Sequence, residues 1–156
     1  MDTEREHEAQ WNPDRPRIEA DPLLRLMDER REVLDRRLDA IKLRGRTPRV
    51  CLYVLARSGS TPARFCEAAR AYAEAQGWQS SSLQVFTDRL GVTDPLLRPS
   101  WSVARQQIRG GFVNGVVAVT YSAISLHLDE YALQLSFIDG GGGFLALVSA
   151  ETGENR

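Results

Sequence analysis

Five polar residues that could bind a ligand stand just after three apolar runs of the chain. They are Ser58, Ser60, Asp88, Tyr121 and Ser122. If the apolar runs are parallel strands of one sheet, their carboxyl ends form a common edge, where open α/β sheets bind ligands. Hydroxyl groups outnumber charges in this set, which suits a small neutral ligand better than a phosphate. Alternatively, Ser58-Gly59-Ser60 forms an anion-binding turn, or a turn that only connects two elements.

Positive charge is missing from a long part of the chain. From Gly110 to Glu154 the sequence contains no lysine and no arginine, although it contains Asp129, Glu130 and Asp139. Arginine and lysine hold phosphate groups and stabilise the charge that develops in phosphoryl transfer. We therefore expect this part of the chain to contribute no cation to a phosphate site.

Neither a metal site nor a cofactor is predicted. Cys51 and Cys66 fall in an apolar run and a helical pattern, which is typical of buried free thiols. The two histidines, His7 and His127, are far apart and match no ligand spacing. The glycine run 140–143 precedes an expected strand rather than a helix, so it is not a phosphate-binding loop.

The composition is that of one globular domain. The chain has 156 residues, of which 42% are hydrophobic and 26% charged, and it can bury a core without disulfides. Because the net charge is −1, we expect DNA binding by this chain alone to be weak or absent. No run is apolar enough for a signal sequence or long enough for a membrane span, so the cytoplasm is the expected compartment.

An amphipathic helix is expected over residues 21–46. Asp21-Pro22 is a typical helix start, and Gly45 is a typical end. Its heptad-like positions hold Leu24, Met27, Arg31, Leu34, Leu38 and Ile41. The other faces of the helix carry mixed charge, and Arg30 lies on one of them. The apolar positions either pack on the chain's own domain or form a short coiled coil, which would make the protein a homo-oligomer or join it to a protein partner.

Strands and helices alternate over residues 47–151. Strands are expected at 50–56, 83–87, 113–120 and 144–148, with helices that begin at Thr61-Pro62, at Ser100 as N-cap, and near Leu126. Strands joined by helices imply a parallel sheet. We predict an α/β fold with a small, doubly wound, mainly parallel four-stranded sheet flanked by helices. The tails 1–20 and 152–156 are expected to lie outside it, the first of them disordered.

The segment from Arg49 to Glu151 resembles the catalytic domain of the resolvase/invertase-type serine recombinases. The shared features are Tyr53 in an apolar strand, the helix 65–73, Gly77-Trp78, Phe86-Thr87-Asp88, Arg98-Pro99, Gly110 or Gly111, and a helix with Glu130 and Leu133 before a glycine-rich turn. The resemblance implies a small doubly wound fold. It also implies a chemistry in which a serine attacks a DNA phosphodiester while arginines hold the phosphate.

Both motifs that carry the family's chemistry are missing from this chain. The family has arginine two residues and serine four residues after the strand tyrosine, whereas this chain has Leu55 and Arg57 there. The Asp-Arg-Leu-any-Arg motif after the third strand is replaced by Tyr-Ser-Ala-Ile-Ser at 121–125. Loss of even one such donor costs about 3–4 kcal/mol of transition-state stabilisation. If the chain nevertheless cuts DNA, the resemblance points to Ser58, Arg57, Arg98 and Asp88 as its catalytic candidates.

Three functions remain in competition. The first is a catalytically degenerate recombinase-like domain that associates with itself or a partner, in a recombination, mobile-element or regulatory context. The resemblance implies a dimerisation helix and a DNA-binding domain after residue 151, and under this first reading we expect the protein to lack both. The second is an active or conditionally active recombinase that cuts DNA through Ser58. The third is a binder of a small neutral ligand on the same fold.

Overall fold

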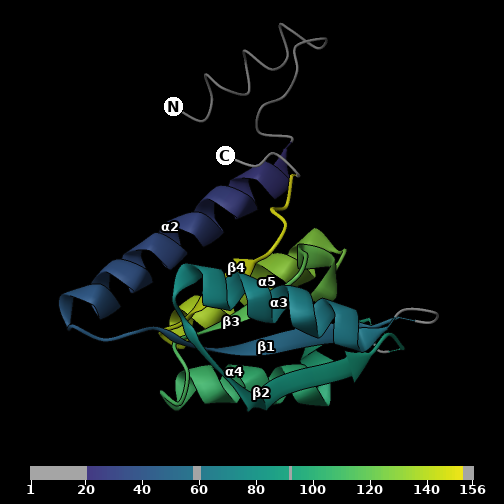
Figure 1. Ribbon diagram of the computed structural model, residues 1–156. Coiled ribbons are helices and arrows are strands. Elements are labelled where there is room, and N and C mark those ends of the chain that lie inside the picture. Colours follow the sequence, from purple (N-terminus) through teal and green to yellow (C-terminus); the bar gives the residue numbers. More distant parts are fainter. Residues whose placement is uncertain (1–20, 58–60, 92, 153–156) are drawn as a thin grey trace, which may run out of the picture.

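Four parallel strands form one sheet in the order β2-β1-β3-β4 (Figure 1). The computed structural model describes residues 21–57, 61–91 and 93–152. The strands are β1 (Arg49–Ala56), β2 (Gln79–Arg89), β3 (Gly115–Ala118) and β4 (Phe144–Leu147). All three strand pairs are parallel, which confirms the predicted α/β class and the parallel sheet.

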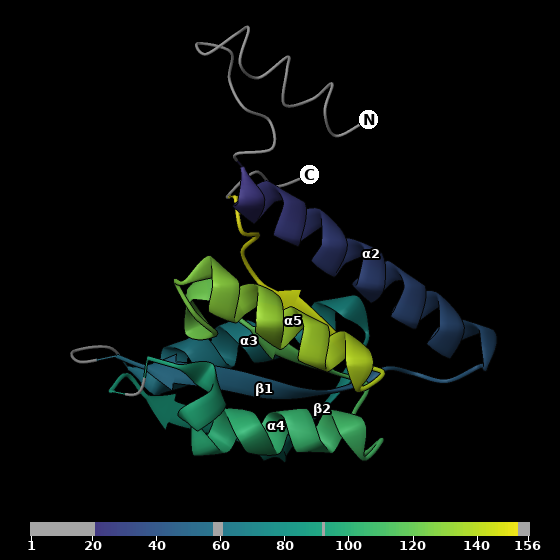
Figure 2. The same ribbon diagram turned by 180° about the vertical axis from the view of Figure 1, so that it is seen from behind.

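Helices cover both faces of the sheet. They are α2 (Pro22–Leu43), α3 (Pro62–Gln76), α4 (Pro99–Arg109) and α5 (Leu128–Gly140), with short 3-10 turns η2 (Pro95–Leu97) and η3 (Tyr121–Ala123). The helix α3 lies on one face, and α4 and α5 lie on the other, as the two opposite views show (Figures 1 and 2). The chain order reverses between β1 and β3, because β2 and β3 lie on opposite sides of β1.

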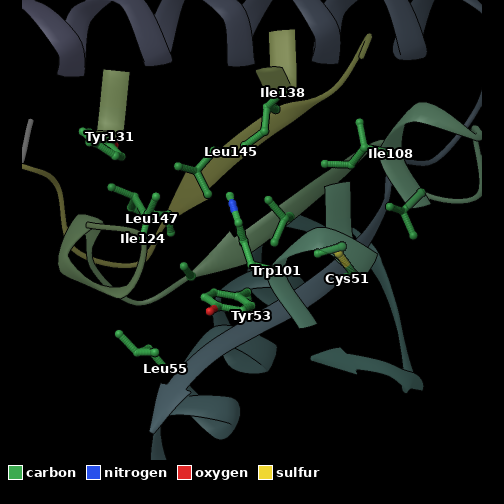
Figure 3. Close-up of a cluster of buried hydrophobic side chains, with 14 of the residues drawn as sticks. Cys51, Tyr53, Leu55, Trp101, Ile108, Ile124, Tyr131, Ile138, Leu145 and Leu147 are labelled. Atoms are coloured by element: carbon green, nitrogen blue, oxygen red, sulfur yellow. The ribbon is translucent and has the colours of Figure 1, made fainter. Parts of the chain in front are cut away.

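The strand β1 is buried on both faces, as its nearly unbroken apolar run predicts. Val50 and Leu52 pack towards α3, while Cys51 and Tyr53 pack towards α4 and α5. Figure 3 shows the second of these clusters, in which the Tyr53 ring lies edge-on to Trp101 with 4.8 Å between ring centroids. The alternation of β1 side chains thus joins two cores across one sheet.

The boundaries of several elements differ from those expected. The strand β2 begins at Gln79, earlier than the predicted 83, because residues 79 and 80 pair with the start of β1. The strand β3 covers only the four residues that pair with β4, fewer than predicted. Ser100 is not an N-cap: α4 begins at Pro99 with Arg98 as N-cap. By contrast, Asp21 caps α2 as predicted, since its Oδ1 accepts a hydrogen bond from the Leu24 amide at 3.1 Å.

The helix α2 lies across β4 and α5 of its own domain (Figures 1 and 2). Of the predicted seam, Met27 is buried, while Leu34, Leu38 and Ile41 are partly buried against the α3-side core. Leu24 of the seam is 37% exposed, whereas Leu26, which was not assigned to the seam, is buried. Of the two packings considered for this helix, the structure therefore shows the one in which the helix packs on its own domain.

Arg30, which the sequence places on a charged face of the expected helix, is buried. Arg30 is 6% exposed and forms an ion pair with Glu151, which is equally buried. Its Nη1 also donates to the Leu145 carbonyl of β4 at 3.3 Å. A pattern that counts only apolar residues assigns such an arginine to the polar face, because its partner lies far away in sequence.

Candidate functional site

A cavity of about 280 Å³ lies at the carboxyl ends of β1 and β3. Its walls come from four elements or their ends: Tyr53, Val54, Leu55 and Arg57 around the end of β1, Phe65 on α3, Val119 and Thr120 after β3, and Ser122 and Ala123 on η3. This is the point where the strand order reverses, and doubly wound sheets bind their ligands at such points. This cavity, which we call the switch-point cavity, lies at the sheet edge where the sequence analysis expected a ligand site.

Apart from Tyr53, three residues with polar side chains line this cavity. The hydroxyl oxygens of Thr120 and Ser122 are 2.6 Å apart and share a hydrogen bond. The exposed guanidinium of Arg57 donates to the Ser122 carbonyl through Nη2 at 3.4 Å. The Tyr53 hydroxyl is bonded to Asp88, and the remaining wall atoms are mostly apolar. The cavity thus combines an apolar surface with one cation and the hydroxyls of Thr120 and Ser122.

Asp88 serves the fold at the end of β2. Its two carboxylate oxygens accept hydrogen bonds from the backbone amides of Ser100 and Trp101 at 3.0 and 2.8 Å. Oδ2 also accepts a hydrogen bond from the Tyr53 hydroxyl at 2.9 Å. Asp88 thus caps α4 from a neighbouring strand, and it does not line the cavity.

The Tyr53 hydroxyl is held in its protonated form. Burial, together with the hydrogen bond to Asp88 and the negative charge of that carboxylate, raises the pKa of Tyr53 well above its usual range. The positive charge of Arg98 opposes this shift. A neutral phenol that donates to a carboxylate is a structural group, and nothing in this arrangement prepares it to act as a base.

Arg98 is buried, with 2% of its surface exposed. Nη1 donates to the Ala123 carbonyl at 2.8 Å, and Nη2 donates to the Thr93 carbonyl at 3.0 Å. These bonds tie the segment before α4 to the η3 turn. In these two contacts the guanidinium holds the backbone in place. Arg98 is not among the residues that line the cavity.

The predicted site residues therefore fall into separate groups. Ser122 lines the cavity, whereas Asp88 lies at the α4 cap. The Tyr121 ring packs on Tyr131, with 5.4 Å between ring centroids. Ser58 and Ser60 lie outside the described residues.

Several wall residues escaped the sequence analysis. They are Val54, Leu55, Phe65, Val119, Thr120 and Ala123. Apolar residues at the end of a strand look like ordinary core residues. The one available signal was Thr120, a hydroxyl residue at the end of the expected third strand.

The thiols and the described carboxylates and imidazole offer no chemistry at this site. Cys51 is fully buried and Cys66 partly so, and both are free. Burial raises the pKa of Cys51 to about 12, so this thiol is protonated and unreactive. In the described parts of the chain no three histidine, cysteine or acidic residues gather as metal ligands would. Nor does any described helix have the length and apolar character needed to cross a membrane.

Comparison with known proteins shows which solved structures share this fold. No protein-family model matches the sequence, and no curated protein matches it significantly. Among solved structures, the N-terminal catalytic domain of TP901-1 integrase is similar, with a TM-score of 0.57 and 19% identity over 64% of this chain and 76% of that one. The C-terminal catalytic domain of ISC1926 TnpA, an IS607-like serine recombinase, has a TM-score of 0.55 and 15% identity over 65% and 70%.

A third similar structure is the first open reading frame of transposon ISC1904 from Sulfolobus solfataricus P2. It has a TM-score of 0.50 and 12% identity, over 70% of this chain and 71% of that one. The first of these structures is named as an integrase catalytic domain and the second as a serine recombinase catalytic domain, and each match covers about two thirds of this chain. The four parallel strands, their order and the flanking helices thus give this chain the resolvase-like fold of serine recombinase catalytic domains.

Proposed function

We propose that this chain is a non-cleaving, recombinase-like domain that acts by association with a second copy or with another protein. The observation that carries the proposal is the character of the switch-point cavity. A site that holds a phosphate for cleavage needs several cations. The walls of this cavity instead include Leu55, Val119 and Ala123, and Arg57 is the one charged lining residue among those described. The process it serves would be DNA recombination, a mobile element or its regulation, by analogy with proteins of this fold.

The other candidate groups support the same proposal. Arg98 donates to two backbone carbonyls, and Asp88 accepts from two backbone amides. The stretch from Gly110 to Glu154, which includes the loop after β3, contains no lysine or arginine. Charge that develops on a phosphoryl group would meet few donors here, and preorganised donors supply much of such catalysis.

The two outer strands of the sheet, β4 and β2, have different neighbours among the described residues. The helix α2 lies along β4, and Arg30 donates to the Leu145 carbonyl of that strand. On the other side, β2 has β1 as its one strand neighbour among the described residues. Unpaired backbone groups on an outer strand favour pairing with a further chain. We take the β2 edge as the association surface.

The β2 edge also presents an apolar side chain to solvent. Pairing passes from Val50 with Ser80 to Leu52 with Val85, so residues 81–84 bulge opposite the single residue Cys51. Leu83, in this bulge, is 89% exposed. Association through α2 is the alternative proposed from the sequence. It would need the outward face of the helix, because much of the predicted seam packs inside the chain.

Light scattering on the full chain tests the association. We expect the mass of a dimer or a larger assembly, and a return to monomer mass in Leu83→Asp. Leu43→Asp is the matched control, since Leu43 is 88% exposed at the end of α2 and is not part of β2. A wild type that stays monomeric at every concentration would rule out self-association and leave only association with a different protein.

Incubation with supercoiled DNA tests the absence of cleavage. We expect no covalent protein–DNA adduct from the wild type or from Ser58→Ala. An adduct that forms with the wild type and disappears in Ser58→Ala would overturn the proposal in favour of an active recombinase.

A further inference from the structure

The switch-point cavity has the features of a small-molecule site. It is concave, it is formed by residues from several elements, and it is mostly apolar with a few polar groups, as ligand sites usually are. Its volume of about 280 Å³ is close to the lower end of the range for ligand pockets, about 300 Å³. The size admits a ligand with a single ring or a short chain.

Three of the polar residues that line the cavity lie at one part of its wall. Arg57, Thr120 and Ser122 come together through the bond from Arg57 to the Ser122 carbonyl and the bond between the two hydroxyls. Only one proton fits between the hydroxyl oxygens, so the second hydroxyl proton can donate to a ligand. The Arg57 guanidinium has five N–H donors in all, so it can bind an anion in addition to its contacts within the chain.

The apolar groups form the rest of the wall. They come from Val54 and Leu55 at the end of β1, Phe65 on α3, and Val119 and Ala123 around η3. No carboxylate lines the cavity among the described residues. An anionic ligand head therefore meets donors without a competing negative charge, while its body meets carbon atoms.

We propose that this cavity binds a small monocarboxylic acid with an apolar body, its carboxylate at Arg57 and the Thr120–Ser122 hydroxyls. A guanidinium pairs with a carboxylate through two parallel hydrogen bonds. An inorganic phosphate would leave the apolar wall unfilled and would have one guanidinium for up to two charges. The site revises the neutral ligand expected from the sequence, because Arg57 adds a cation beside the hydroxyls. It does not depend on whether the chain associates.

A titration followed by amide NMR tests the site. Hexanoate, benzoate and 3-phenylpropanoate are compared with their amides and with inorganic phosphate, while the shifts of Thr120, Ser122 and Ala123 are recorded. We expect at least one carboxylate to bind with a Kd of about 1 mM or tighter. Its amide and phosphate should bind at least about tenfold more weakly, as the loss of a charge-assisted bond predicts.

Two variants locate the binding. Arg57→Gln removes the cation from an exposed position, and we expect it to weaken carboxylate binding about tenfold. Arg64→Gln, a matched change of an exposed arginine on α3 outside the cavity wall, should leave the Kd unchanged. Val119→Phe fills the cavity and should abolish binding. If Val119→Phe does not fold, Ala123→Leu serves the same purpose.

Three outcomes would overturn the proposal. One is that no carboxylate of the series shifts these amides at its solubility limit. Another is that Arg57→Gln and Arg64→Gln weaken binding equally, which would mean a general charge effect. The third is that phosphate or the amides bind as tightly as the acids. Light scattering on the same samples tests the association separately. The measured mass shows whether copies associate through the β2 edge, whereas the amide shifts show whether the cavity binds a ligand.

Discussion

Arg30 and Glu151 form a buried, two-bond ion pair between residues 121 positions apart in the chain. The Nε–Oε2 distance is 2.6 Å and the Nη2–Oε1 distance is 2.8 Å. The Tyr131 hydroxyl donates to Oε2 of the same carboxylate at 2.7 Å. These contacts join α2, α5 and the segment after β4, so the pair fixes the added N-terminal helix to the sheet.

We expect Arg30→Ala to lower the free energy of unfolding by about 3–5 kcal/mol, because it leaves the Glu151 carboxylate buried without its charge partner. Urea denaturation with circular dichroism measures the change. Arg36→Ala is the control, since Arg36 pairs with Asp139 in an exposed position and should cost less than about 1 kcal/mol. Equal losses in the two variants would contradict a special role for the buried pair.

The same pair predicts an acid-sensitive stability. Burial by itself raises the pKa of Glu151, but the hydrogen bond and charge of Arg30 and the Tyr131 hydroxyl outweigh it and hold the pKa below its usual range. A lowered folded-state pKa contributes stability above the unfolded pKa of about 4.3. That stability is lost as pH falls through the folded value.

The test compares the wild type with Glu151→Gln between neutral pH and pH 2. Glu151→Gln should be the less stable protein at neutral pH, and the difference should shrink below about pH 4. Denaturation midpoints at each pH give the two curves. Parallel curves over this whole range would show that Glu151 contributes no proton-linked stability.

Gly115 is expected to tolerate no side chain. A Cβ at this position would lie 2.5 Å from the Phe144 ring of the neighbouring strand, and that ring is fully buried. Gly115→Ala should therefore destabilise the protein by about 1–3 kcal/mol through overpacking. Gly140→Ala is the control, because nothing lies within 4 Å of its added Cβ. Thermal unfolding of the two variants should separate them clearly, and similar melting temperatures would contradict the prediction.

Asp88→Ala should destabilise the fold more than a simple cap deletion does. It removes two hydrogen bonds to the start of α4 and leaves the buried Tyr53 hydroxyl without that partner. A lost cap costs about 1 kcal/mol, and the stranded hydroxyl adds about 1–3 kcal/mol.

Asp94→Ala is the matched control for this change. Asp94 accepts one hydrogen bond from the Leu96 amide at the start of η2, so only the cap contribution should be lost. Chemical denaturation of both variants measures the difference. A loss in Asp88→Ala no larger than in Asp94→Ala would argue that the Tyr53–Asp88 bond adds nothing.

The alternation of the chain could be read from the sequence because it depends on local patterns. The apolar run 50–56 marked a strand covered on both faces, and the Asp21-Pro22 and Thr61-Pro62 signals marked helix starts that the structure contains. The boundaries of β2 and β3 were less predictable, because strand ends depend on which residues of the neighbouring strand they pair with.

The candidate site could be predicted only in outline. Ser122 lies at the carboxyl edge of the sheet, where the sequence placed it, because strand ends in a parallel sheet meet at one edge. The separation of Asp88 from the cavity could not be foreseen. Its carboxylate is turned to the α4 amides, and no short-range signal distinguishes a capping aspartate from a ligand-binding one.

By itself, the sequence determined the parallel α/β class and the absence of lysine and arginine from Gly110 to Glu154, since periodicity and composition need no knowledge of contacts. The tertiary structure alone decided that α2 packs on its own domain and which side chains line the cavity. Arg30 is buried because Glu151, far along the chain, supplies the charge that makes its burial tolerable. Side-chain partners of this kind are set by three-dimensional packing, and a linear pattern carries no record of them.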